Sequence, residues 1–197
     1  MTAVARRTQE ERSSATRTRL LEAAVDALIE HGIAGASLPE ICRRAGVSRG
    51  AQLHHFPTRA ELLAAAVELL FDVRHAAFRA RMAASPPRDV DDALAELWAI
   101  YTSGPLYAWL ELVTAARTDP ELRRHVVAVD ARFEDEATVT MSALFGLDPA
   151  PARTAARLVT SLLDGLATHR ILADDDRVAQ DVLALFAATL KPMLEKR

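Results

Sequence analysis

The chain has 197 residues, which fits one large or two small domains and is long enough to bury a core. Half of the residues are apolar, and there are only 7 glycines and 9 prolines, which excludes a disordered or fibrous chain. Alanine, leucine, arginine and glutamate are frequent, so the composition favours helices throughout. The single cysteine, Cys42, excludes an intramolecular disulfide and a cysteine-based zinc site, and we expect its side chain to be buried.

Charge is distributed unevenly along the chain, although the net charge is only −3. Residues 1–62 carry 9 arginines and 7 acidic residues, whereas the remainder carries 15 basic and 20 acidic residues. This small imbalance suggests that the N-terminal part meets an anion such as nucleic acid. The sequence has no apolar signal segment and no run apolar enough to cross a membrane, so we predict a soluble, cytoplasmic protein without a membrane partner.

The N-terminal part predicts an arm and two helices. Residues 1–13 are polar and basic, which is typical of a flexible arm. Apolar residues then recur at three- and four-residue spacing over 15–32, which predicts an amphipathic helix that ends near Gly32. Ser37 and Glu40 have the spacing of a capping box, and they predict the start of a short second helix.

Two more helix starts follow. Gly46 ends the short helix, and Ser48 can cap the next one. Thr58 and Glu61 form a second capping box before a long helix that runs to residue 84. The rest of the chain predicts helices over residues 89–104, 106–118, 119–146, 148–173 and 177–197. We therefore predict an all-α fold of about nine helices.

The segment GVSRGAQLHHF, residues 46–56, has the features of a recognition helix. Two short helices joined by a glycine-containing turn are typical of the helix-turn-helix. Arg49 can pair with guanine, Gly50 lets the backbone approach the bases, and Ala51 can meet a thymine methyl group. Other side chains lie at helix ends, where phosphates bind well: Ser37, His55, Thr58 and Arg59. The arm could follow the DNA backbone or enter a minor groove with Arg6, Arg7 and Arg12.

Other interpretations of this segment are a metal site, a catalytic cluster or a solvated helix surface. His54 and His55 are adjacent, so on a helix their side chains point about 100° apart, and no further ligand lies nearby. A catalytic histidine would need an acid and a nucleophile, but Glu40 and Ser48 already serve as caps. No paired carboxylates or phosphate-binding loop stand out either. We therefore expect no enzyme, no cofactor and no metal site.

The segment SLPEICRRAGVSRGAQLHHFPTRAELL, residues 37–63, resembles the DNA-binding domain of the tetracycline-repressor (TetR) family of bacterial transcriptional regulators. The resemblance covers residues 14–74, and it implies that residues 75–197 form a ligand-binding and dimerisation domain. It also implies a homodimer that binds a palindromic double-stranded operator, usually as a repressor, and is released by a small molecule. The expected DNA-binding residues are Ser37, Ser48, Arg49, Gly50, Ala51, Gln52, Leu53, His54, His55, Thr58 and Arg59.

Two positions depart from the family pattern. After Gly50 and Ala51 the family usually has a leucine that packs under the recognition helix and a tyrosine that touches DNA, whereas this chain has Gln52 and Leu53. One explanation is that Gln52 is hydrogen-bonded at the helix edge, because an unpaired buried amide is costly. The other is a rotated helix, which would let Leu53 and Phe56 share the core face and would turn Gln52 toward an adenine.

The aromatic residues of the middle helices could line a pocket for a largely apolar or aromatic effector, with Glu111, Thr114, Asp164 or His169 as polar anchors. The alternative is an ordinary core, and the pocket interpretation depends on the resemblance. The predicted pocket residues are Phe71, His75, Trp98, Tyr101, Trp109, Thr114, Asp164 and His169.

The last two predicted helices carry apolar stripes, which suggest either an intramolecular helix pair or a dimer interface. Gly165 suggests a close backbone approach, since glycine costs about 1 kcal/mol inside a helix. The predicted interface residues are Leu158, Leu162, Leu166, Val182, Leu185, Phe186 and Leu190. The alternative function is a helical protein that binds or sequesters a small molecule and keeps a degenerate DNA-binding head.

Overall fold

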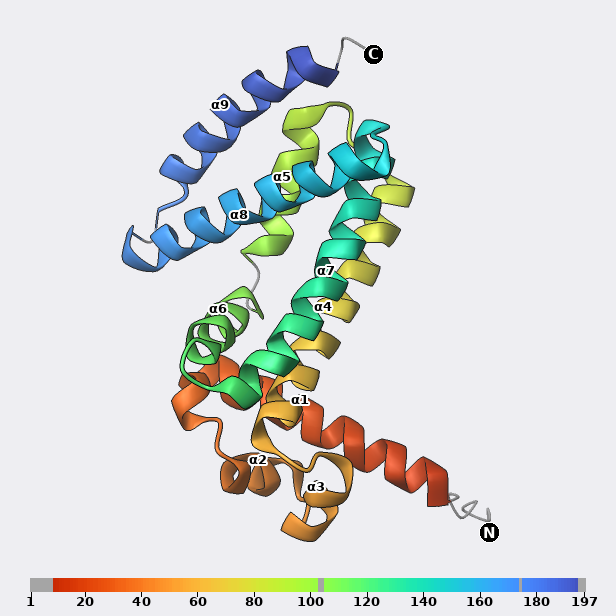
Figure 1. Ribbon diagram of the computed structural model, residues 1–197, viewed down its shortest axis with the longest axis vertical. Helices are drawn as coiled ribbons and strands as arrows, with labels where there is room; N and C mark the ends of the chain where they lie inside the picture. Colours follow the sequence, from red (N-terminus) through yellow and green to blue (C-terminus); the bar gives the residue numbers. More distant parts are fainter. Residues whose placement is uncertain (1–8, 103–104, 174, 195–197) are drawn as a thin grey trace, which may run out of the picture. The chain divides into compact units, whose positions relative to one another are not determined.

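The computed structural model describes residues 9–102, 105–173 and 175–194, and these residues form helices and no strand (Figure 1). The helices are α1 (Gln9–Gly35), α2 (Leu38–Ala45), α3 (Arg49–His55), α4 (Arg59–Ala84), α5 (Val90–Tyr101), α6 (Pro105–Ala116), α7 (Pro120–Phe145), α8 (Pro149–Ala173) and α9 (Arg177–Leu194). The predicted all-α fold class is confirmed.

The chain divides into two compact units that are not contiguous in sequence. The head unit comprises the residues up to Asp72 together with Tyr107–Val126, and the body unit comprises Val73–Leu106 and the residues from Val127 onward. Most of α6 and the start of α7 therefore pack with the predicted DNA-binding region rather than with the body. The functional division into residues 14–74 and 75–197 stays a prediction.

Hydroxyl caps set the starts of three helices in the head unit. The side chains of Ser37, Ser48 and Thr58 each accept a hydrogen bond from the backbone N–H three residues further on, at 3.4, 3.2 and 3.1 Å. Gly46 ends α2 with a φ of 61°, in the left-handed region where glycine carries no steric penalty. The predicted helix starts and the predicted end of α2 are confirmed.

Helix α1 begins at Gln9, earlier than its apolar pattern indicates. Residues 9–13 are helical, so the predicted flexible arm is wrong for this part of the chain. Glu10 and Glu11 in the first turn favour the helix through its dipole, although they add nothing to the apolar stripe. Within α1, Gly32 leaves the helical conformation, close to the predicted helix end. Arg6 and Arg7 lie outside the described residues, and Arg12 is exposed on α1.

The core of the head unit is formed where α1 packs against α2 and α3. Its apolar side chains come from every third or fourth position of these helices and from the start of α4, as an amphipathic pattern requires. Cys42 is among them, and its predicted burial is confirmed. The most deeply buried large apolar residues of the head unit are Leu20, Leu28, Ile41, Phe56, Leu62, Leu63, Val67 and Leu112.

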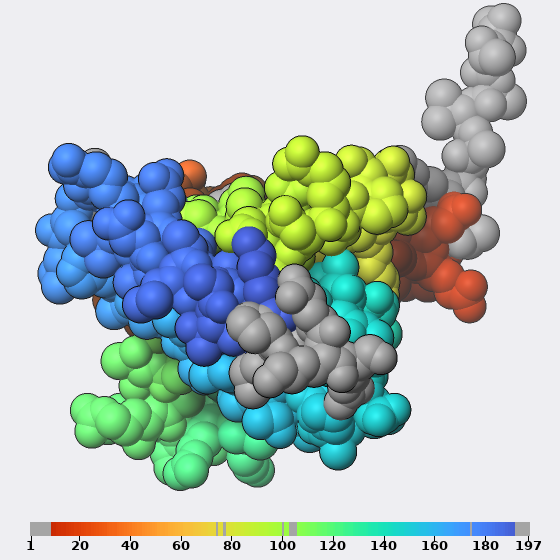
Figure 2. Space-filling view, turned by 90° about the horizontal axis from the view of Figure 1, so that it is seen from above, coloured from red at the N-terminus to blue at the C-terminus, as the bar shows by residue number. Residues whose placement is uncertain are grey.

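In the body unit, α5 contacts both α8 and α9, and buries Leu94 and Trp98. Leu163 of α8 and Leu183 of α9 are also buried. Figure 2 shows α9 and the adjoining end of α8, in blue, at the surface facing the viewer. Among the described residues, no helix has an apolar stretch long enough to span a membrane.

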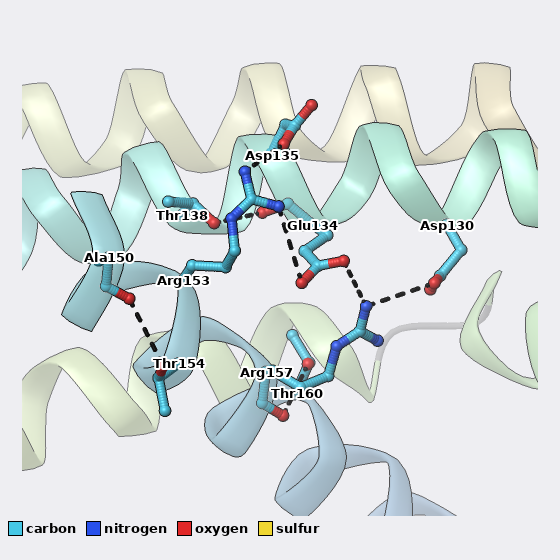
Figure 3. Close-up of polar contacts among 9 residues, drawn as sticks. All are labelled: Asp130, Glu134, Asp135, Thr138, Ala150, Arg153, Thr154, Arg157 and Thr160. Atoms are coloured by element: carbon cyan, nitrogen blue, oxygen red, sulfur yellow. Dashed lines mark hydrogen bonds and ion pairs between the residues drawn. The ribbon is translucent and has the colours of Figure 1, made fainter.

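Ion pairs join α7 to α8 in the body unit (Figure 3). Arg157 of α8 reaches Glu134 at 2.6 Å and Asp130 at 3.4 Å, both on α7. Arg153, one turn earlier on α8, pairs with Asp135 at 3.1 Å. Most of these groups are well exposed, so each ion pair adds little stability.

Candidate nucleic-acid interface

Helix α3 has a buried inner face and an open outer face. Gln52 and Phe56 lie on the inner face and are buried. A Cβ atom added at Gly50 would meet nothing within 4 Å, so the backbone there is open to close approach. The remaining residues are either exposed (Arg49, Gly50, Leu53 and His54) or half-buried (Ala51 and His55).

Gln52 lies in the core and does not face outward. Its exposed fraction is 0%, and its side-chain amide donates a hydrogen bond to the carbonyl oxygen of Phe56. Leu53 is 45% exposed. The rotated helix is therefore wrong, and so is the expectation that Gln52 contacts DNA. The amide fills the position usually held by leucine, and its hydrogen bond offsets part of the cost of burial.

Arg59 and Glu111 bind the two backbone polar groups of Ile33. Arg59 Nε donates to the Ala36 carbonyl at 2.8 Å, and Arg59 Nη2 donates to the Ile33 carbonyl. The Glu111 carboxylate accepts a hydrogen bond from the Ile33 N–H. These bonds fix the turn between α1 and α2. Arg59 therefore has a structural role inside the head unit, and its predicted DNA contact stays a prediction. Glu111 anchors α6 to α1.

The two adjacent histidines of α3 have different environments. Partial burial, followed by the nearby charges of His54 and Arg17, lowers the pKa of His55. This shift favours the neutral imidazole, which can still donate one hydrogen bond to a phosphate oxygen. Arg17 of α1 lies over the Phe56 ring, 5.0 Å from its centroid. In the described part of the chain, no three His, Cys, Asp or Glu side chains are grouped to hold a metal ion.

The hydroxyl groups that cap the three helices can still donate a hydrogen bond to DNA. Ser37, Ser48 and Thr58 each use an oxygen lone pair to accept from the backbone. A hydroxyl that accepts in this way still has its O–H to donate to a phosphate oxygen. Their predicted phosphate contacts stay predictions.

The basic residues of α2 are balanced by acids. Glu40 pairs with Arg43 at 2.7 Å and with Arg44 at 2.6 Å, and Arg44 also reaches Glu30 at 2.8 Å. Hydrogen bonds from Arg43 and then Arg44 lower the pKa of Glu40 to about 2. Helix α2 therefore adds little net positive charge, whereas Arg49 on α3 is exposed.

Two of the predicted pocket residues, Tyr101 and Asp164, are in contact in the body unit. The Tyr101 hydroxyl donates to Asp164 Oδ1 at 2.9 Å. Burial raises the pKa of Asp164 more than the hydrogen bond from Tyr101 lowers it. His75 contacts the Glu136 carboxylate, and Trp98 is buried.

The other predicted pocket residues do not join this group. Phe71 and Trp109 belong to the head unit and meet edge to face, with ring centroids 6.0 Å apart. Thr114 and His169 are exposed, and the Thr114 hydroxyl donates to the Leu110 carbonyl of its own helix. The pocket as a whole stays a prediction.

The predicted interface residues range from exposed to buried. Leu158 and Leu185 are 52% and 71% exposed, whereas Leu166 is buried. A Cβ atom added at Gly165 would meet nothing within 4 Å, so no described part of the same chain makes the close approach that this glycine suggests. The half-buried members are Leu162, Val182, Phe186 and Leu190.

A capped α2 followed by a capped α3 with an open outer face defines a helix-turn-helix DNA-binding protein. Residues 20–66 match the bacterial regulatory proteins of the tetR family, and residues 102–195 match the C-terminal domain of BetI-type transcriptional repressors. The chain belongs to the TetR family, and it is a DNA-binding transcriptional regulator, not an enzyme.

Individual relatives agree with this assignment. The chain is 32% identical to an uncharacterized HTH-type transcriptional regulator of Mycobacterium tuberculosis over 189 residues, 93% of this chain and 97% of the relative. It is 40% identical to the HTH-type transcriptional regulator CymR of Pseudomonas putida over 123 residues, 61% of each chain. The solved structure of the multidrug binding protein EbrR with ethidium is similar, with a TM-score of 0.66, 27% identity and coverage of 86% of this chain and 96% of that chain.

Proposed function

We propose that this regulator is a homodimeric repressor that binds a palindromic operator through α3 and is released by an aromatic, positively charged effector. One observation carries the DNA contact: Arg49, Leu53 and His54 surround the open backbone of Gly50 on the outer face of α3. Recognition of bases needs this combination, because side chains must reach the base edges while the helix backbone enters the groove.

Exposed apolar side chains on α8 and α9 support the homodimer. Leu158 and Leu172 of α8 and Leu185 of α9 are 52%, 86% and 71% exposed, and large apolar side chains exposed on these two helices favour a surface that a partner covers. The backbone at Gly165 is open on the same helix. A second copy with two-fold symmetry would cover these residues and would present two α3 helices to the two halves of a palindrome.

The Tyr101–Asp164 pair supports a cationic aromatic effector. Asp164 is a half-buried carboxylate. Burial, the largest effect, raises its pKa; the Tyr101 hydrogen bond and the Arg157 charge lower it, and the Asp130 charge raises it. A cation would offset the cost of burying this carboxylate, and Tyr101, whose hydroxyl is bonded to Asp164, places an aromatic ring next to it. EbrR, similar in fold, binds ethidium, which is a flat aromatic cation.

The DNA-binding part is tested by retardation of a duplex from upstream of the protein's own gene, with an unrelated duplex of equal length as the control. We expect specific retardation that weakens steeply with salt, because phosphate contacts dominate the affinity. Equal retardation of both duplexes would contradict the proposal. Effector binding without specific DNA binding would favour the alternative function as a sequestering protein.

The effector part is tested with proflavin as the probe, in the absence of DNA because proflavin intercalates. The fluorescence anisotropy of proflavin is followed on titration with wild type, Asp164→Asn and Asp181→Asn, the last being an exposed aspartate of α9. We expect Asp164→Asn to weaken binding about tenfold and Asp181→Asn to bind like wild type. Equal binding by all three proteins would show that Asp164 is not the anchor.

A further inference from the structure

We propose that Leu53 is a specificity-determining residue that reads the C5-methyl group of a thymine in the major groove of the operator. This inference rests on the proposed function, because it needs α3 to lie in that groove. It concerns the position at which this chain has leucine instead of the tyrosine that its family usually carries there.

The rotation of α3 determines that Leu53 faces outward. Successive residues of a helix are about 100° apart, and the burial of Gln52 and Phe56 fixes the inner face. Leu53 then lies on the side of α3 that it shares with Arg49, one turn earlier, and with Gly50. All three of these residues are exposed. Gln52 therefore occupies the core position and holds Leu53 out of the core.

The chemistry of leucine limits what Leu53 can read. Its side chain has no hydrogen-bond donor or acceptor, so it cannot recognise the polar edges of the bases or bind a phosphate. It keeps 45% of its surface exposed, and covering this surface is favourable only against an apolar group. The apolar group that base pairs present in the major groove is the thymine methyl.

Gly50 lets the helix come close enough for a side chain as short as leucine to reach the bases. A leucine side chain is shorter than that of tyrosine, so the helix must come closer to the bases for contact. At Gly50 no side chain stands between the backbone and the DNA, and the space is empty for 4 Å around a would-be Cβ atom. Ala51 is half-buried and shorter than Leu53, so Leu53 is the better placed of the two to meet a methyl group.

The experiment removes one methyl group at a time. An operator is first selected from random duplexes with the wild-type protein, and its thymines are then replaced singly by deoxyuridine, which lacks only the C5-methyl. At one thymine in each half-site we expect a loss of wild-type affinity of about fourfold, the contribution of one buried methyl group. Leu53→Ala should bind the thymine operator more weakly and should be insensitive to deoxyuridine at that position.

A matched control separates this contact from a general weakening. Arg49→Ala should bind more weakly on both operators but should keep the full thymine-to-deoxyuridine difference. Circular dichroism checks that each variant is folded, which we expect because both side chains are exposed. The inference on Leu53 alone is overturned if wild type binds its selected operator but is insensitive to deoxyuridine at every thymine, or if Leu53→Ala keeps the difference. If no operator is selected over random DNA, the proposed function itself fails.

Discussion

The carboxylate of Glu111 on α6 accepts a hydrogen bond from the backbone N–H of Ile33, although 78 residues separate them in sequence. Gly32, just before Ile33, has a φ of 63° and a ψ of −174°, a conformation found essentially only for glycine. A Cβ atom at Gly32 would lie 2.7 Å from an oxygen of Glu111. The break in α1 and the carboxylate on α6 therefore depend on each other.

Gly32→Ala should lower the free energy of unfolding by about 2 kcal/mol, because alanine is strained in this conformation and its methyl group displaces the Glu111 carboxylate. Glu111→Ala alone should cost about 1 kcal/mol, the contribution of a typical hydrogen bond. In the double variant the loss should be smaller than the sum, since the close contact is gone. Urea unfolding of the four proteins checks this, and strictly additive losses would contradict it.

Arg59→Ala should change mainly the stability of the protein, whereas Arg49→Ala should change mainly its affinity for the operator. Arg59→Ala should lower the free energy of unfolding by about 2 kcal/mol, because the Ile33 and Ala36 carbonyls lose a charged donor. Arg49→Ala should leave stability unchanged and weaken operator binding by about 1–3 kcal/mol. Denaturation and DNA titration are measured on both. An Arg59→Ala protein that is stable but binds DNA poorly would show that Arg59 acts mainly as a DNA contact.

Gln52→Leu should fold at least as stably as wild type, whereas Gln52→Glu should be destabilised by about 3 kcal/mol or more at pH 7. Gln52 Oε1 is buried and finds no hydrogen-bond partner among the described residues, so leucine removes an unpaired polar atom. Glutamate has the same shape but would bury a charge facing the Phe56 carbonyl. Equal stability of the Gln52→Glu variant would mean that this site is open to water.

The stability gained by Asp164→Asn should grow with pH. Burial raises the pKa of Asp164 in the folded protein above the ordinary value of 3.8, so ionisation of this group destabilises the fold. The contribution of Asp164 to wild-type stability falls as the pH rises through its folded pKa, whereas asparagine does not titrate and still accepts from the Tyr101 hydroxyl. Urea unfolding of both proteins, from about pH 4.5 to about pH 7.5, measures the difference in stability. A difference that shrinks as the pH rises would show the opposite sign of the pKa shift.

Gly165→Leu should abolish the homodimer while leaving each subunit helical. Nothing in the described chain lies within 4 Å of a Cβ atom at Gly165, and leucine is a better helix former than glycine by about 0.8 kcal/mol. Ala95→Leu, on an exposed position of α5, serves as the control that adds bulk elsewhere in the body unit. Sedimentation equilibrium gives the mass of each variant. A dimeric Gly165→Leu protein would place the interface on another surface.

The parts of the fold that the sequence predicts are those determined locally. Ser37, Ser48 and Thr58 cap their helices because the acceptor and the donor are three residues apart, a distance that is visible in the sequence. The early start of α1 was missed because its polar first turns carry no apolar periodicity. The sequence locates the break at Gly32, but it does not show that Glu111 of α6 binds the backbone there.

The candidate site was predicted less completely, for a reason that two residues illustrate. Arg59 lies at a helix start where a phosphate contact is plausible, yet its acceptors are 23 and 26 residues earlier in the chain. Whether Gln52 is buried or faces outward depends on which face of α3 packs against α1, and tertiary packing decides this. The exposed residues of α3 follow once this rotation is known.

The discontinuous head unit limits how hybrid regulators can be made from this protein. A splice after residue 74 would transfer α1, α2 and α3 to a new body but would leave Glu111 behind, and Ile33 would lose its acceptor. A transplanted head would keep its native turn only if Tyr107–Val126 moved with it. Operator preference is therefore better exchanged by grafting the few exposed side chains of α3 than by swapping whole N-terminal segments.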